Sequence, residues 1–130
     1  PSIVIKRPTK CNPNNNVALV LSISDFINSD KFPDHLKENT DVYEITIDGT
    51  PSTHFLKVRE QIAIFEMHFR ETLNEIQKLY GKDKETHVLP AIPAPLAIKV
   101  GLTLLPKKEM PLVIYDYNSE YNGLRKVLVV

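Results

Sequence analysis

Two short polar segments of the chain carry side chains that could hold an anion or a sugar. The first, Ser22–Phe26, follows an apolar run, and its hydroxyls and turn amides could bind a phosphate or a ribose. Satisfying local backbone groups at a strand end explains its serines equally well. The second, Asp48–His54, precedes a long periodic segment, and capping by Ser52 or Thr53 is the better explanation there. Neither segment defines a site by itself.

A third segment, His87–Pro95, is rigid rather than polar. It has three prolines among the six residues from Pro90 to Pro95, and these prolines lack the N–H groups of a phosphate cradle. The small side chains of Ala91 and Ala94 would let a base or a sugar pack close to the backbone. A stiff connection that only positions the following helix accounts for the composition equally well.

The residue pattern gives little indication of a catalytic site or a metal site. The four histidines show no metal-ligand spacing, and Cys11 lies in a polar loop with no indicated base. Asp25, Asp48 and Asp116 follow expected strands, where aspartates more often form turns and caps. P-loop and dinucleotide glycine motifs are absent. These features predict a chain without catalytic residues, metal ligands or a cofactor.

Strands and helices alternate in the expected secondary structure. Runs of apolar and β-branched residues predict strands, and apolar residues at steps of three or four predict helices. After a short extended start at Ser2–Lys6, the expected order is strand Val17–Leu21, short helix Asp30–Glu38, strand Val42–Ile47, helix Phe55–Tyr80, strand His87–Leu89, helix Leu96–Leu105, and strands Leu112–Tyr115 and Lys126–Val130. This order predicts an α/β fold, Rossmann-like, with a mostly parallel sheet flanked by helices.

Length and composition limit the class of protein. The 130 residues, 42% of them hydrophobic, suit one globular domain, which we divide into an extended segment and loop at 1–16 and a lobe at 17–130. Sixteen basic and sixteen acidic residues argue against contact with long nucleic acids. No stretch is apolar enough to span a membrane, and a single cysteine suits the cytoplasm. Because the chain starts at Pro1, we expect an excised, processed or separately encoded piece.

Four sequence features together resemble the C-terminal half of SAVED domains. They are the run Ala18–Ser24, the long amphipathic helix Phe55–Tyr80, the stretch His87–Gly101 with its Pro-Ala-x-Pro turn, and the run Leu112–Asn118. SAVED domains look like two fused CARF-type lobes that bind cyclic oligonucleotides and activate effectors in bacterial anti-phage systems, including CBASS and CRISPR-associated ones. The resemblance implies a CARF-like sensor lobe that is not itself an enzyme.

The resemblance also implies a ligand site and partners. By position, the family's contacts map to three loops, whose residues are Ser22, Ile23, Ser24, Asp25, Thr53, His54, Ala91, Ile92, Pro93 and Ala94. The ligand would be a cyclic oligonucleotide, and the partners an N-terminal SAVED lobe, an effector module and possible further copies on ligand binding. Two alternatives stay open: a structural or assembly domain without ligand, and, with less support, a lobe that degrades the nucleotide.

Overall fold

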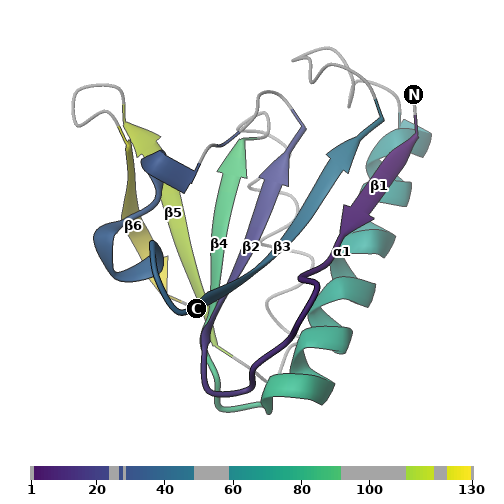
Figure 1. The fold of residues 1–130 in the computed structure, drawn as a ribbon. Helices are drawn as coiled ribbons and strands as arrows, with labels where there is room; N and C mark the ends of the chain where they lie inside the picture. Colours follow the sequence, from purple (N-terminus) through teal and green to yellow (C-terminus); the bar gives the residue numbers. More distant parts are fainter. Residues whose placement is uncertain are drawn as a thin grey trace.

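A six-stranded mixed sheet forms the centre of the computed structural model, which describes residues 2–23, 27, 29–48, 59–91, 111–118 and 123–129. The elements are β1 (Ile3–Lys6), β2 (Asn16–Ser22), the 3₁₀ turns η1 (Ser29–Lys31) and η2 (Asp34–Leu36), β3 (Thr40–Ile47), α1 (Arg59–Tyr80), β4 (Thr86–Ala91), β5 (Leu112–Asn118) and β6 (Gly123–Val129). The strand order is β1-β3-β2-β4-β5-β6 (Figure 1). The four inner strands are parallel, and the two edge strands pair antiparallel with their neighbours. The expected α/β class and mostly parallel sheet are confirmed.

Strand β2 lies at the centre because its side chains are apolar on both faces. Its residues from Val17 to Leu21 are at most 2% exposed. Val17, Leu19 and Leu21 pack in one core cluster with α1, whereas Ala18 and Val20 belong to a second cluster on the other face. A continuous apolar run is typical of a parallel strand covered on both sides.

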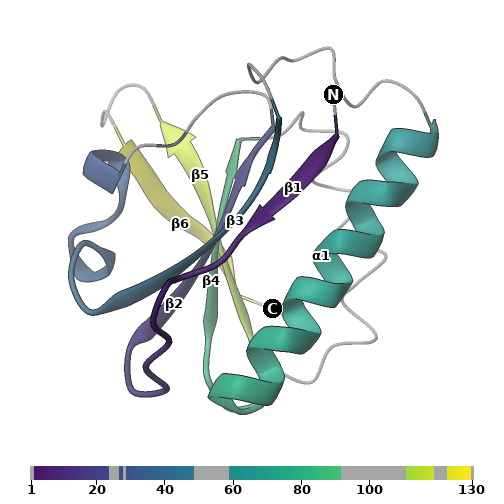
Figure 2. The ribbon, with the colours of Figure 1, turned by 45° about the vertical axis from the view of Figure 1, so that its right-hand side comes forward.

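Helix α1 covers one face of the sheet and lies along β1 (Figure 2). Its buried side chains recur every three or four residues, as the sequence predicts: Phe65, Phe69, Leu73, Ile76 and Tyr80. The helix ends at Gly81, whose φ of +92° and N–H bond to the Gln77 carbonyl at 2.9 Å fit the expected left-handed end. The first four expected helical residues, 55–58, lie outside the described residues.

The opposite face is covered in part by the two 3₁₀ turns, η1 and η2. Phe32 and Leu36 insert there against Ala18, Val20 and Leu89. The expectation of one short helix over Asp30–Glu38 is wrong. Pro33, at φ −56° and ψ 148°, is extended and separates the two turns.

Strand β4 is longer than the sequence predicts. The expectation that it ends at Leu89 is wrong, because β4 continues through Pro90 to Ala91. The Ala91 carbonyl accepts the Ile23 N–H at 3.2 Å, so the backbone groups of Ala91 face β2. Along a strand, the backbone N–H and C=O groups of adjacent residues point to opposite neighbouring strands, so those of Pro90 point toward β5. The pairing between β4 and β5 stops at Val88, before Pro90. Pro90 therefore removes no sheet hydrogen bond.

The N-terminal segment joins the sheet. Ile3–Lys6 pairs with β3, and Arg7 Nε then donates to Glu75 Oε1 of α1 at 2.7 Å.

The last two strands are longer than the sequence predicts. Strand β5 continues past the expected end at Tyr115 to Asn118, and β6 begins at Gly123, before the expected start at Lys126. The expected helix Leu96–Leu105 lies outside the described residues. In the part of the chain that the structure describes, no helix is long and apolar enough to cross a membrane.

Candidate functional site

The chain reverses its course through the sheet between β2 and β4. From β2 it first moves to β3 on one side, and after α1 it returns to β4 on the other side of β2. In open α/β sheets, ligands bind outside the carboxyl ends of the strands at such a switch point. The strands that flank this point end in Ser22 and Ala91, which are register partners. This edge is the candidate site.

The structure places Ser22, the first residue of one predicted binding segment, beside Ala91, which lies within another. Ser22 lies opposite Ala91, and the Ile23 N–H donates to the Ala91 carbonyl at 3.2 Å. Ile23 faces the α1 core, whereas Ala91 is half-buried. The other predicted site residues, Ser24, Asp25, Thr53, His54, Ile92, Pro93 and Ala94, lie outside the described residues.

The Ser22 hydroxyl already has a partner. It is fully buried and donates to Glu44 Oε2 at 2.6 Å, while the Thr46 hydroxyl donates to the Ser22 carbonyl at 2.9 Å. A hydrogen bond to a carboxylate is stronger than one between neutral groups. A phosphate at Ser22 would have to displace Glu44 and would meet its negative charge, so this edge better suits a neutral ligand group.

Glu44 is a site residue that the sequence reasoning missed. Its Oε1 lies 4.0 Å from Lys6 Nζ, and the two side chains are 23% and 64% exposed, respectively. Among the described residues, Oε1 receives no hydrogen bond, so it can accept one from a ligand. One signal in the sequence pointed to it, namely a carboxylate in a strand of β-branched and aromatic residues.

A second polar cluster lies on the same face of the sheet. Tyr115 Oη is 3.0 Å from His35 Nε2 and 2.9 Å from His87 Nδ1. A phenol has one proton to donate, so one histidine accepts it and the other donates an N–H when both are neutral. Burial raises the pKa of Tyr115, which keeps its hydroxyl protonated. The cluster thus joins η2 to β4 and β5.

The whole chain, residues 1–130, matches the family model of the SMODS-associated and fused to various effectors sensor domain, SAVED. The chain belongs to the SAVED family. No curated protein matches the sequence. The resemblance expected from Ala18–Ser24, His87–Gly101 and Leu112–Asn118 is confirmed.

One solved structure has a similar fold. It is the Acinetobacter baumannii Cap4 SAVED/CARF-domain containing receptor with the cyclic trinucleotide 3'3'3'-cAAA. The TM-score is 0.66 at 11% identity, and the match covers 99% of this SAVED domain and 27% of that chain. At this identity the likeness concerns the fold, and the domain spans about a quarter of the receptor's length.

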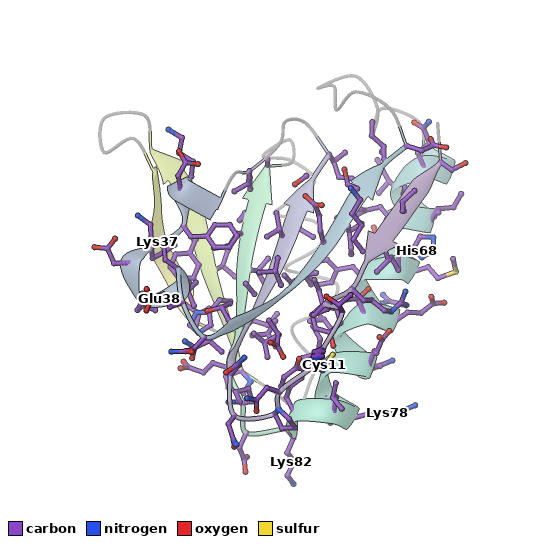
Figure 3. The ribbon with its side chains drawn as sticks, in the orientation of Figure 1. Cys11, Lys37, Glu38, His68, Lys78 and Lys82 are labelled. Atoms are coloured by element: carbon purple, nitrogen blue, oxygen red, sulfur yellow. The ribbon has the colours of Figure 1, made fainter. Side chains whose placement is uncertain are left out.

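A third polar network stabilises the far end of the SAVED domain. Asp41 accepts hydrogen bonds from the Tyr80 hydroxyl, the Asn12 N–H at 2.8 Å and the Asn15 amide at 3.1 Å. Cys11 Sγ lies 3.6 Å from the Tyr43 hydroxyl, and Figure 3 shows Cys11 toward the end of the molecule where α1 finishes. These contacts hold the loop before β2 against β3 and α1, which is a structural role.

A surface hollow lies against α1, away from the candidate site. A hollow of about 430 Å³ on the outer side of α1 is lined by Asn74, Gln77, Lys78 and Lys82. Lysines near a helix C-terminus are explained by the helix dipole. In the described ranges of the SAVED domain, no three histidine, cysteine or acidic side chains are placed to hold a metal ion.

Proposed function

We propose that this SAVED domain senses a cyclic oligonucleotide second messenger at the carboxyl edge of β2 and β4 and thereby activates an effector in anti-phage defence. The observation that carries the proposal is the pairing of Ser22 with Ala91 at the switch point of a sensor-family domain. The Cap4 receptor, which has the same fold, was solved with a cyclic trinucleotide. A nucleotide of that size suits a chain without excess positive charge.

The domain is, in this proposal, the C-terminal lobe of a Rossmann-like, CARF-like pair. The four parallel strands, numbered along the chain, have the spatial order second, first, third, fourth, which is the order of doubly wound nucleotide-binding sheets. Its partners are an N-terminal SAVED lobe and an effector, with further copies joining on ligand binding. We place the protein in the cytoplasm, where cyclic oligonucleotide messengers act.

The binding proposal is tested by titration calorimetry of the natural full-length protein with cyclic di-, tri- and tetra-adenylate. We expect one ring size to bind, and failure of every cyclic nucleotide tried would contradict the proposal. Ala91→Leu adds bulk beside Ser22 and should weaken binding about tenfold or more, as expected for loss of close packing worth more than 1.4 kcal/mol. Ala63→Leu, on the exposed surface of α1, is the matched control and should bind as the parent does.

Sensing without cleavage is part of the same proposal. Burial raises the pKa of Tyr115, the Ser22 hydroxyl is engaged by Glu44, and the described residues present no metal cluster. Incubation with the bound nucleotide and chromatography should return the intact ring. Accumulation of linear product that scales with protein concentration would instead support the degrading alternative.

A further inference from the structure

Among the described residues, Glu44 Oε1 accepts no hydrogen bond and lies 4.0 Å from Lys6 Nζ, so it has room for a donor from a ligand. We propose that Glu44 Oε1 accepts a hydrogen bond from a ribose hydroxyl of the bound nucleotide, so that the domain distinguishes ribonucleotide rings from 2'-deoxyribonucleotide rings. This inference rests on the proposed function, because it concerns the same edge of the sheet.

The position of Glu44 in the fold supports this role. β3 is the second parallel strand along the chain and pairs directly with β2, the strand that opens the candidate site. Glu44 follows Ser22 by 22 positions (44 − 22), and the 2.6 Å hydrogen bond places its carboxylate at the carboxyl end of β2. In dinucleotide-binding sheets, whose glycine motif this chain lacks, an acidic residue about 20 positions after that motif accepts a hydrogen bond from a ribose hydroxyl, and Glu44 has a comparable spacing from Ser22.

The two carboxylate oxygens of Glu44 have different surroundings. Oε2 is occupied by the buried Ser22 hydroxyl, which fixes the orientation of the group. Oε1 has only a loose contact with Lys6 Nζ at 4.0 Å, and the side chain is 23% exposed. The carboxylate is therefore oriented in advance and keeps one oxygen for an incoming donor, at little further entropic cost.

The chemistry of a carboxylate narrows the choice of ligand group. An ionised carboxylate only accepts hydrogen bonds and repels phosphates, so its partner must be a ribose hydroxyl or a base N–H. The described strand neighbours of Glu44 on the same face are not aromatic: Val4, Lys6, Val20, Val42, Thr46 and Ser22. Phe32 packs on this face against Val20 but is only 7% exposed, so its ring is not open for a base to stack on. A compact hydroxyl fits this setting better than a base edge.

A ligand and protein cycle tests the inference directly. The affinities of cyclic di-, tri- and tetra-adenylate are compared with those of the same rings built from 2'-deoxyadenosine, for the parent and for Glu44→Ala and Glu44→Gln. For the ring that binds, we expect the 2'-deoxy form to bind the parent about tenfold more weakly, as for a lost hydrogen bond to a charged group. That penalty should fall below about twofold in Glu44→Ala.

Two variants guard against a purely structural effect. Glu44→Gln keeps the size of the side chain and an acceptor for Ser22, so it should fold normally and reduce the 2'-deoxy penalty to about threefold because the neutral amide bonds more weakly. Glu38→Gln is the control; this exposed carboxylate lies beside Lys37 before β3 (Figure 3) and should leave the penalty unchanged.

The outcomes separate the inference from the proposed function. Equal 2'-deoxy penalties in the parent and both Glu44 variants would overturn the ribose role, as would a parent that binds both sugars alike. If the folded parent bound none of the rings, the proposed function itself would fail.

Discussion

The Tyr115 hydroxyl lies 2.9 Å from His87 Nδ1, and the same hydroxyl is 3.0 Å from His35 Nε2. His87 comes from β4, Tyr115 from β5 and His35 from η2, so one phenol connects three elements. Tyr115 is 2% exposed and His87 9%, whereas His35 is open to solvent. The buried partners therefore depend on this contact more than the exposed one does.

Replacement of Tyr115 by Phe should lower the free energy of unfolding by about 1–3 kcal/mol, because a buried histidine nitrogen then loses a hydrogen-bond partner. Urea denaturation followed by circular dichroism measures the change. His35→Ala removes the exposed partner and should cost less than about 1 kcal/mol, since water can replace it at the Tyr115 hydroxyl. A larger loss for His35→Ala than for Tyr115→Phe would show that the contact is not what stabilises this face.

The pH dependence of stability on the acid side should depend on Asp41. Burial raises the pKa of this carboxyl, but hydrogen bonds from Tyr80, Asn15 and Asn12 outweigh burial and hold it below its ordinary 3.8. A lowered pKa contributes stability that is present above the unfolded value and is lost as the pH falls through the folded value. When the pH is lowered from 6 to 2, the urea midpoint of unfolding should therefore fall less steeply in Asp41→Ala than in the parent.

At neutral pH, Asp41→Ala should destabilise the domain by about 2–4 kcal/mol, because the Tyr80 hydroxyl and two further donors lose their acceptor. Asp34→Ala is the matched control. The Asp34 side chain is 99% exposed and pairs with Lys37 at 3.3 Å, so its loss should change stability by less than about 0.5 kcal/mol. Similar losses for the two variants would argue against the buried network.

On the alkaline side, three buried tyrosines should limit stability. Burial raises the pKa of Tyr43 to about 12 and also raises those of Tyr80 and Tyr115 above the ordinary 10.0. Groups with a raised folded pKa contribute fully below the unfolded value, and their contribution is lost as the pH rises through the folded value. The urea midpoint of unfolding should fall as the pH rises above 10. In the folded protein, the ultraviolet absorbance of the phenolate should appear at a higher pH than it does in the unfolded protein. Tyrosines that all ionise near pH 10 in the folded protein would contradict this expectation.

The core face of α1 should be far less tolerant than its outer face. Phe65 is fully buried between the helix and the sheet, whereas Met67, two residues later, is 47% exposed. Phe65→Ala should cost about 3–5 kcal/mol through lost burial and a new cavity. Met67→Ala should stay within about 0.5 kcal/mol. Thermal denaturation of both variants measures the difference, and equal losses would place the helix in a different rotation.

Much of the fold follows from local patterns in the sequence. The apolar run Val17–Leu21 requires a strand covered on both faces, and the spacing from Phe65 to Tyr80 requires a helix with one buried side. These signals are repeated along a single element, so neighbouring residues reinforce one another. The expected boundaries of the elements at Pro33 and Pro90 were wrong. The effect of a proline depends on whether its missing N–H would have formed a hydrogen bond in the folded structure, which the local sequence does not show.

The sequence by itself determined the α/β class, the family and the segments that begin the candidate site. Only the tertiary structure decided that Glu44 holds Ser22, that Tyr115 joins His35 to His87, and that Asp41 anchors the N-terminal loop. Each of these contacts joins residues at least 22 positions apart (44 − 22 for the closest pair). Such contacts depend on strand register and on the path of the chain between elements, which no local periodicity encodes.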